Sequence, residues 1–158
     1  AYDFEGELAV VIGKPGRHIP QAEALSHIFG YSIFNDGSVR DFQQHSLAAG
    51  KNFDSSGAFG PWIVDAASVG DPQALTIVTK LNGEIVQNGT TADMMHNVAK
   101  LIAFLSGMFA LEPGDVISTG TPDGVGAGRK PPLWMQPGDT IEVSIEKIGT
   151  LSNAIVAE

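Results

Sequence analysis

The amino-acid sequence predicts a mainly β fold with one long helix, an α+β architecture formed by a single domain over residues 1–158. The chain contains 19 glycines and 9 prolines, a density of turn formers that favours many short strands over a helix bundle. Short apolar, β-branched runs recur between these turns, whereas one long segment shows helical spacing of its apolar residues. We therefore expect a mixed, mostly antiparallel β fold.

The strands are predicted from apolar runs that end at glycine, proline or asparagine-rich turns. Asn82-Gly83 stands between two alternating runs and predicts a type I′ hairpin. The turn Asn35-Asp36-Gly37 closes an earlier run. The expected strands are Glu7–Ile12, Ile28–Phe34, Trp62–Val64, Leu75–Leu81, Glu84–Gln87, Asp115–Thr119, Thr140–Ile145 and Leu151–Val156.

Two helices are expected between these strands. Ser38, with Asp41 three residues later, is typical of a helix start and predicts a short helix through Ala48 or Ala49. Thr91 is the expected cap of the long helix over 92–108, whose apolar residues are spaced helically. The glycine-rich segments 50–60 and 124–132 are expected to form mobile walls of a site.

Composition excludes several classes of protein. The net charge of −9 disfavours nucleic acid and anionic membranes as partners, and no apolar run approaches the length of a membrane helix. The lack of cysteine excludes disulfide scaffolds and thiolate chemistry. Because no signal peptide is visible either, we expect a cytoplasmic protein.

Acidic residues near the N-terminus suggest a metal site. Asp3, Glu5 and Glu7 have strand spacing, so an extended chain would project them from one face. Asp36, in a turn after an apolar strand, could complete an all-oxygen site suited to Mg²⁺, Mn²⁺ or Ca²⁺. The alternatives are a solvated edge-strand face for the first three and ordinary turn chemistry for Asp36.

Four other residues are candidates for substrate contact. Arg40 and Gln43 are helical neighbours that could grip a carboxylate, although Arg40 could equally pair with Asp41. Lys51 lies in a glycine-flanked loop, and Thr121 belongs to a Ser118–Pro122 turn with backbone N–H groups suited to an anion. Phosphate-binding loops, nucleophile elbows and zinc-protease motifs are not found.

Taken together, these segments resemble the fumarylacetoacetate hydrolase family. They occur in family order along the whole chain, and the ordered set is specific although each segment is weak by itself. The matching segments are DFEGELAVVIGK (3–14), FNDGSVRDFQ (34–43), GKNFD (50–54), GPW (60–62), NGE (82–84), TGTP (119–122), GVG (124–126) and IGTLSN (148–153).

The resemblance implies a mixed β-sandwich roll that forms a homodimer and carries a divalent metal, commonly Mg²⁺. By motif match, Glu5, Glu7 and Asp36 would be the metal ligands. Four further matched positions would contact the substrate: Lys51, Arg40, Gln43 and Thr121. Of these, Lys51, Arg40 and Gln43 would also have catalytic roles. Family substrates are acylpyruvates, fumarylpyruvate-like products of aromatic catabolism and related 2-oxo or enol acids.

The reaction class follows from the same resemblance. We expect hydrolysis of a C–C bond in such a 2-oxo acid, with an isomerase or tautomerase, a decarboxylase, or a non-catalytic metal-binding β domain as alternatives. Hydrolytic family members carry a histidine–glutamate pair in a segment before the Asp3-x-Glu5-x-Glu7 motif, and no residue here matches that pair. Either an N-terminal segment or lid is missing from this chain, or the protein performs only lyase or isomerase steps. We expect the missing segment, because a strand-like run begins within four residues of the start and the initiator methionine is absent.

Overall fold

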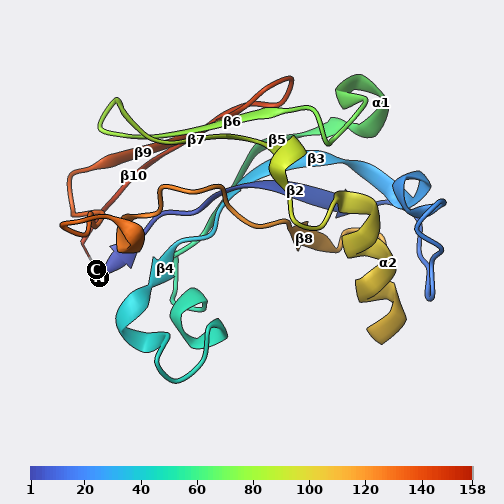
Figure 1. The fold of residues 1–158 in the computed structure, drawn as a ribbon, viewed down its shortest axis with the longest axis horizontal. Helices are drawn as coiled ribbons and strands as arrows, with labels where there is room; N and C mark the ends of the chain where they lie inside the picture. The colour runs from blue at the N-terminus through green and yellow to red at the C-terminus, as the bar shows by residue number, and fades with distance from the viewer. Residues whose placement is uncertain (158) are drawn as a thin grey trace.

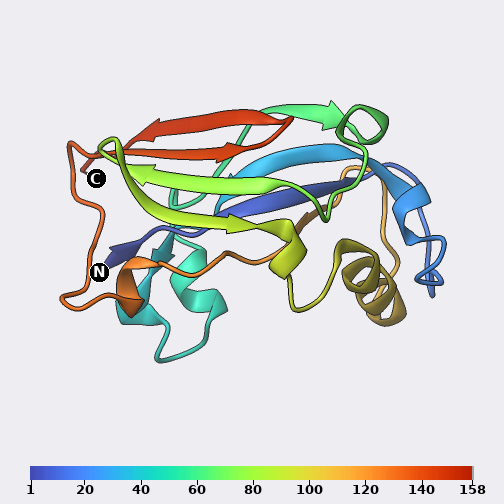
Figure 2. The same ribbon diagram turned by 45° about the horizontal axis from the view of Figure 1, so that its top comes forward.

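The computed structural model describes residues 1–157 and confirms the mainly β prediction: two four-stranded sheets lie face to face (Figure 1, Figure 2). One sheet has the strand order β5-β3-β2-β8 and the other β10-β9-β6-β7, while β1 pairs with β4. The pairs within these sheets are antiparallel. The strands are β1 Tyr2–Asp3, β2 Gly6–Ile12, β3 Ile28–Asn35, β4 Ser38–Val39, β5 Ala58–Asp65, β6 Thr76–Leu81, β7 Glu84–Thr90, β8 Val116–Ser118, β9 Thr140–Ile145 and β10 Gly149–Ala154.

The main core lies between the two sheets and fixes the position of β2. Leu8 and Val10, two residues apart in β2, point to the same face of the sheet. There they belong to one buried cluster with Ile77 of β6 and Val143 of β9. All seven residues of β2 are buried, and β3 and β8 pair with the strand on either side within its sheet. A strand held on all sides is a rigid support for side chains at its start.

The hairpin of β6 and β7 is confirmed. Asn82 and Gly83 both have positive φ, 52° and 84°, which a type I′ turn requires and which asparagine and glycine tolerate best. The strand pairing closes at Leu81 opposite Glu84. This hairpin matters for the site because β7 carries Gln87, described below.

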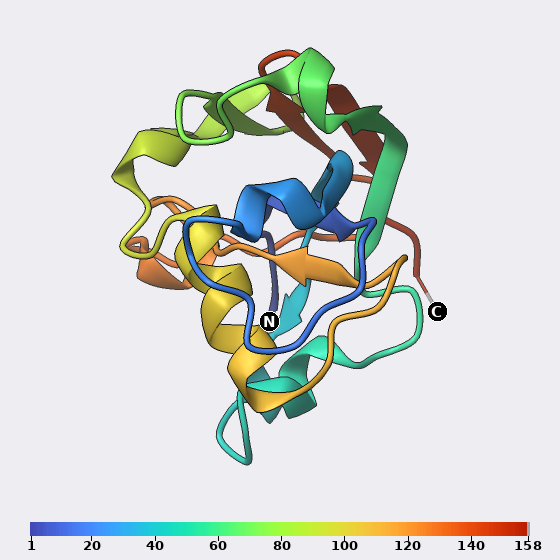
Figure 3. The same cartoon turned by 90° about the vertical axis from the view of Figure 1, so that its right-hand side faces the viewer.

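The long helix is shorter than predicted. α2 spans Val98–Met108, and its N-cap is Asn97, whose side chain accepts a hydrogen bond from the N–H of Lys100. The preceding segment, Thr91–Asp93, forms a separate 3₁₀ turn capped by Thr90. A cap at Asn97 satisfies the orphan N–H groups of the first turn, so the helix begins there despite the apolar residues upstream. Figure 3 shows α2 beside the sheet that contains β8.

The predicted helix from Ser38 is wrong. Ser38 belongs to β4, and two 3₁₀ turns follow, Arg40–Phe42 and Ala48–Lys51. The side chain of Ser38 is buried and contacts Glu5 and the carbonyl of Asp36 instead of capping a helix. Long-range contacts to the site thus override the local signal.

Other boundaries differ by a few residues. The glycine-rich segment 50–60 does not extend to its expected end as a loop, because β5 already begins at Ala58. Strand β10 begins and ends two residues before its predicted bounds. The short elements α1 Ala66–Val69 and the 3₁₀ turns Ala24–His27 and Gly126–Gly128 complete the chain. Among residues 1–157, no helix combines the length and the apolar character needed to cross a bilayer.

Candidate metal centre and active site

Three carboxylates converge at the start of β2. Ligand oxygens of Glu5, Glu7 and Asp36 all lie within 4.8 Å of one another. Glu5 and Glu7 are buried, with 8% and 3% of their surfaces exposed, and Asp36 is half-buried. Buried carboxylates repel one another unless cations compensate them, so this arrangement needs positive charge.

The backbone of two segments brings these carboxylates together. The N–H of Glu5 donates to Asn35 Oδ1 at 3.1 Å, and the N–H of Asp36 donates to the carbonyl of Glu5 at 2.9 Å. The turn after β3 is therefore fixed against the segment that leads into β2. The antiparallel pairing of Gly6 with Asn35 sets the register of the two segments.

Lys51 supplies one of the compensating cations. Its Nζ lies 2.7 Å from Glu5 Oε2 and also donates to Asp36. Burial by itself would lower the pKa of Lys51, but the hydrogen bonds to Asp36 and Glu5 outweigh burial and raise it above its ordinary value. The ammonium therefore remains charged between two of the carboxylates. Figure 1 shows its segment, after β4, curling beneath the start of β2.

Arg40 supplies the second cation. Its Nη2 lies 2.6 Å from Glu5 Oε1, its Nε donates to Asp3 at 2.8 Å, and its Nη1 donates to Gln43 Oε1 at 3.0 Å. The alternative pairing of Arg40 with Asp41 is not what forms, since Asp41 binds the amino terminus at 2.7 Å. In this structure the guanidinium group orients Glu5 and Gln43.

Gln43 has an amide NH₂ group that makes no hydrogen bond. Its Nε2 is buried and has no hydrogen-bond partner, while its Oε1 accepts from Arg40. An unpaired buried amide N–H group costs free energy unless a ligand oxygen accepts from it. Gln43 therefore fits the contact with a substrate oxygen that the sequence suggested.

Asp3 does not join the three-carboxylate cluster. Its side chain is fully buried and accepts from the N–H groups of Gly126 and Ala127 at 2.7 and 3.0 Å, in addition to Arg40. The chain leaves strand geometry at Phe4 and Glu5, between β1 and β2. Asp3 is consequently turned to hold Arg40 and the segment around Gly126.

Glu7 has a raised pKa although its carboxylate accepts hydrogen bonds. Its carboxylate accepts from the N–H of Gly120 at 3.0 Å and from the hydroxyl of Ser118. Burial nevertheless raises the pKa of Glu7 to about 7, with smaller upward contributions from the charges of Asp36 and Glu5. A divalent cation would relieve the same burial and charge penalties.

Thr121 lies beside the cluster, but its hydroxyl group is engaged by the protein. It donates to the carbonyl of Gly6 at 3.0 Å and accepts from Gln87 Nε2 at 2.8 Å. The predicted anion-binding turn is likewise partly used, since Gly120 N–H donates to Glu7. Contact with a substrate would involve the remaining lone pair of Thr121 or its backbone.

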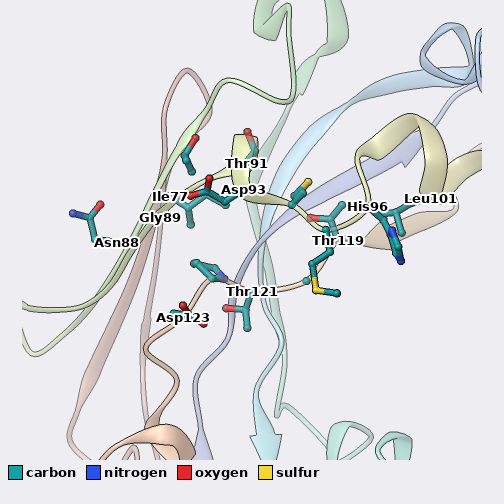
Figure 4. A pocket seen from close by; sticks show the side chains of 15 residues that line it. Ile77, Asn88, Gly89, Thr91, Asp93, His96, Leu101, Thr119, Thr121 and Asp123 are labelled. Atoms are coloured by element: carbon teal, nitrogen blue, oxygen red, sulfur yellow. The ribbon is translucent and has the colours of Figure 1, made fainter.

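A cavity of about 410 Å³ lies on the other side of this turn (Figure 4). Thr119, Gly120 and Thr121 line it from one side, and Asp93 and His96 from the segment that leads into α2. None of the three clustered carboxylates, nor Arg40 or Lys51, lines this cavity. The turn at 119–121 is thus a wall shared by the cavity and the carboxylate cluster.

The donor set fits a hard divalent cation. Three converging carboxylate oxygens without sulfur or imidazole are typical ligands of Mg²⁺, Mn²⁺ or Ca²⁺. Within residues 1–157, this is the one group of three acidic, histidine or cysteine side chains that converges closely enough for a metal ion. The histidine nearest to Lys51 in the sequence, His45, is exposed.

Two supporting residues escaped the sequence analysis. Asn35 holds Glu5, and Gln87 holds Gly6 and Thr121 from the opposite sheet. Asn35 was assigned only a turn role, and Gln87 only the end of a hairpin strand. Their signal was the presence of an amide side chain in an apolar strand or at its end, where a buried amide requires partners.

Comparison with known proteins gives one consistent family. The model of the fumarylacetoacetate (FAA) hydrolase C-terminal region matches residues 1–156. The oxaloacetate tautomerase YisK of Bacillus subtilis is 46% identical over 155 residues, which cover 97% of this chain and 52% of that protein. The chain thus spans about half the length of this curated relative.

Solved structures agree with this assignment. Fumarylacetoacetate hydrolase from Exiguobacterium antarcticum superposes with a TM-score of 0.96 at 46% identity, covering 99% of this chain and 57% of that one. Fumarylpyruvate hydrolase from Pseudomonas aeruginosa, solved with Mn²⁺ and pyruvate, gives 0.90 at 34% identity, covering 99% and 66%. The fold, the order of the motifs and these matches lead to one conclusion: the chain belongs to the fumarylacetoacetate hydrolase family.

Proposed function

We propose that this chain is the metal-binding core of an enzyme that tautomerises or isomerises a small 2-oxo acid. The observation that carries the proposal is the cluster of Glu5, Glu7 and Asp36, whose oxygens converge within 4.8 Å and are flanked by the cations Lys51 and Arg40. Three carboxylates would hold the cation, and the two basic residues would favour an anionic substrate beside it.

The residues of the chain divide the work around the substrate. A bound Mg²⁺ or Mn²⁺ would supply Lewis-acid polarisation of a substrate oxygen. Lys51 would donate to the oxygen that gains negative charge as the substrate enolises. Gln43 would direct its unpaired Nε2 donor to a carboxylate oxygen, and Arg40 would hold Gln43 and Glu5 in the required orientation.

Tautomerisation is favoured over the hydrolysis expected from the sequence. The curated relative YisK is named for a specific reaction, oxaloacetate tautomerisation, and is 46% identical. The Exiguobacterium structure is equally identical but is named only for the hydrolase family as a whole, and the Mn²⁺-containing fumarylpyruvate hydrolase is 34% identical. Hydrolysis of a C–C bond remains the second candidate because that hydrolase shares the fold and was solved with a divalent metal and a 2-oxo acid. Decarboxylation follows as a further branch of the same enolate chemistry. We further propose that the protein forms a homodimer and is located in the cytoplasm.

The test is an assay of oxaloacetate and an acylpyruvate with Mg²⁺, Mn²⁺ or chelator. Enol absorbance reports the loss of the enol, and NMR distinguishes a tautomer from two acids or a decarboxylated ketone. We expect metal-dependent interconversion that is abolished in Glu5→Gln and Asp36→Asn. Asp54→Asn, which removes an exposed carboxylate after Lys51, is the matched control and should behave as wild type.

Each outcome assigns a function. Two acid products would favour the hydrolase. Metal binding without turnover of either substrate would contradict the enzymatic proposal and favour a metal-binding β domain. A wild-type protein that binds no divalent metal would overturn the proposal altogether.

A further inference from the structure

A buried amide from the second sheet reaches the segment that carries the carboxylates. Gln87, in β7, has 2% of its surface exposed. Its Oε1 accepts from the N–H of Gly6 at 3.1 Å, and its Nε2 donates both to Thr121 Oγ1 and to the carbonyl of Pro122 at 2.8 Å. One side chain thus joins β7, the start of β2 and the turn that follows β8.

These partners permit a single orientation of the amide. The N–H of Gly6 requires an acceptor, and the carbonyl of Pro122 requires a donor, so Oε1 and Nε2 cannot exchange places. Because Nε2 donates to Thr121, the hydroxyl of Thr121 directs its hydrogen to the carbonyl of Gly6 at 3.0 Å. Gln87 and Thr121 together therefore hold both polar groups of Gly6.

Gly6 stands between two of the clustered carboxylates. Its own N–H and C=O belong to the peptide units that join it to Glu5 and Glu7, so their orientation sets the directions in which these two side chains leave the backbone. Only glycine fits here, because a Cβ would lie 2.3 Å from Thr79 Oγ1 and 2.9 Å from Val143 Cγ1. The second sheet thus contacts the backbone itself at this point.

We propose that Gln87 is a positioning residue for the metal centre: by holding Gly6 and Thr121, it fixes the separation of Glu5 and Glu7 and the orientation of the Thr121 hydroxyl. The inference rests on the metal centre of the proposed function. It adds a residue outside the cluster, contributed by the opposite sheet, to the groups that determine metal affinity.

The experiment titrates Mn²⁺ alone into the full chain and follows free Mn²⁺ by electron paramagnetic resonance. Gln87→Met keeps the length of the side chain but removes all three hydrogen bonds, and Gln87→Glu keeps an acceptor for Gly6 N–H while losing the donors to Thr121 and Pro122. Loss of a group that orients metal ligands typically weakens affinity by about 10-fold to 100-fold. We expect at least the lower of these losses in both variants, together with an altered spectrum of bound Mn²⁺.

Thr79→Val is the matched control. Thr79 touches the same glycine, is fully buried and has a hydroxyl without a hydrogen-bond partner, so valine preserves the packing and leaves Mn²⁺ affinity unchanged. A purely structural role for Gln87 would lower Tm while the folded protein kept wild-type Mn²⁺ affinity, and this result would overturn the inference. If Gln87→Met does not fold, the Mn²⁺ affinity of Gln87→Glu tests the inference in the same way.

The two proposals fail differently. Wild-type protein that binds no Mn²⁺ contradicts the proposed metal centre, and with it this inference. Wild-type binding with equally tight binding in both Gln87 variants leaves the proposed function intact and rejects the role of Gln87 alone.

Discussion

Lys51 Nζ lies 2.7 Å from Glu5 Oε2 and also binds Asp36, so an ammonium group occupies the point where two carboxylates of the cluster meet. The same two carboxylates are proposed metal ligands. A divalent cation bound there would compete with Lys51 for the same oxygens, and the lysine would then direct its hydrogen bonds toward the substrate.

Replacing Lys51 separates its role in compensating the carboxylates from its proposed role toward the substrate. In Lys51→Met the metal-free protein keeps only Arg40 to compensate the three carboxylates, so its Tm falls and added Mg²⁺ raises Tm by more than in wild type. Turnover should fall on the order of 100-fold, because a donor to the developing oxyanion is lost. Thermal unfolding with and without Mg²⁺ measures the first effect, and Lys100→Met, at an exposed position of α2, is the control. Wild-type turnover in Lys51→Met would contradict the assigned role.

Arg40 should not tolerate exchange for lysine. Arg40→Lys keeps the charge but cannot contact Asp3, Glu5 and Gln43 together, because an ammonium lacks the planar fork of the guanidinium group. We expect a loss of about 2 kcal/mol in the free energy of unfolding, the order of one charge-assisted hydrogen bond. Urea denaturation measures it, and Arg17→Lys, at an exposed site, should be neutral. Equal stability in both variants would show that the network contributes little.

Glu7 gives the metal-free protein a distinctive pH dependence. Its pKa is raised from 4.5 to about 7 in the folded state, so between these values the folded protein holds a proton that the unfolded chain has released. Stability contributed by Glu7 is therefore present below pH 4.5 and is lost as pH rises to 7, on the order of 3 kcal/mol in all.

The difference between wild type and Glu7→Gln isolates this effect from other carboxylates. With chelator present, urea unfolding should show wild type losing stability relative to Glu7→Gln as pH rises from 4.5 to 7. Saturating Mg²⁺ should reverse the difference at neutral pH, because the ionised carboxylate is then a ligand. Parallel curves in chelator would mean that Glu7 titrates normally.

Gly6 should resist even the addition of one methyl group. The Cβ of Gly6→Ala would lie within 3 Å of Thr79 and Val143, and such overpacking costs about 1–3 kcal/mol. The double variant Gly6→Ala/Thr79→Ala removes the closest contact and should recover part of the loss in urea unfolding. Gly107→Ala is the control: its Cβ meets nothing within 4 Å in α2, so alanine should stabilise the helix. A neutral Gly6→Ala would show that the sheets can separate without cost.

The sequence predicted best what depends on neighbours along the chain. Asn82-Gly83 determines its hairpin locally, and the alternation of Glu5 and Glu7 places two carboxylates together. The helix from Ser38 failed because Ser38 contacts Glu5, 33 residues away, instead of its own backbone.

The supporting residues show the same limit more clearly. Gln87 meets Gly6 across 81 residues, and Asp3 meets Gly126 across 123. No local pattern encodes such pairs, since they exist only once two sheets and a returning loop have been assembled. Strand spacing and a turn position suggested that Glu5, Glu7 and Asp36 could converge, and the family motif assigned them as ligands. That role remains a prediction for the metal titrations above.

The acidic and the basic residues of the site belong to segments of unequal local stability. Glu7 belongs to β2, whose residues are all buried, whereas Arg40 and Lys51 belong to short 3₁₀ turns in a largely exposed segment. Amide hydrogens of β2 should therefore exchange only through global unfolding, and those of residues 41–49 through brief local openings. Glu7 thus keeps its position during such openings, whereas Arg40 and Lys51 can withdraw from the cluster and return.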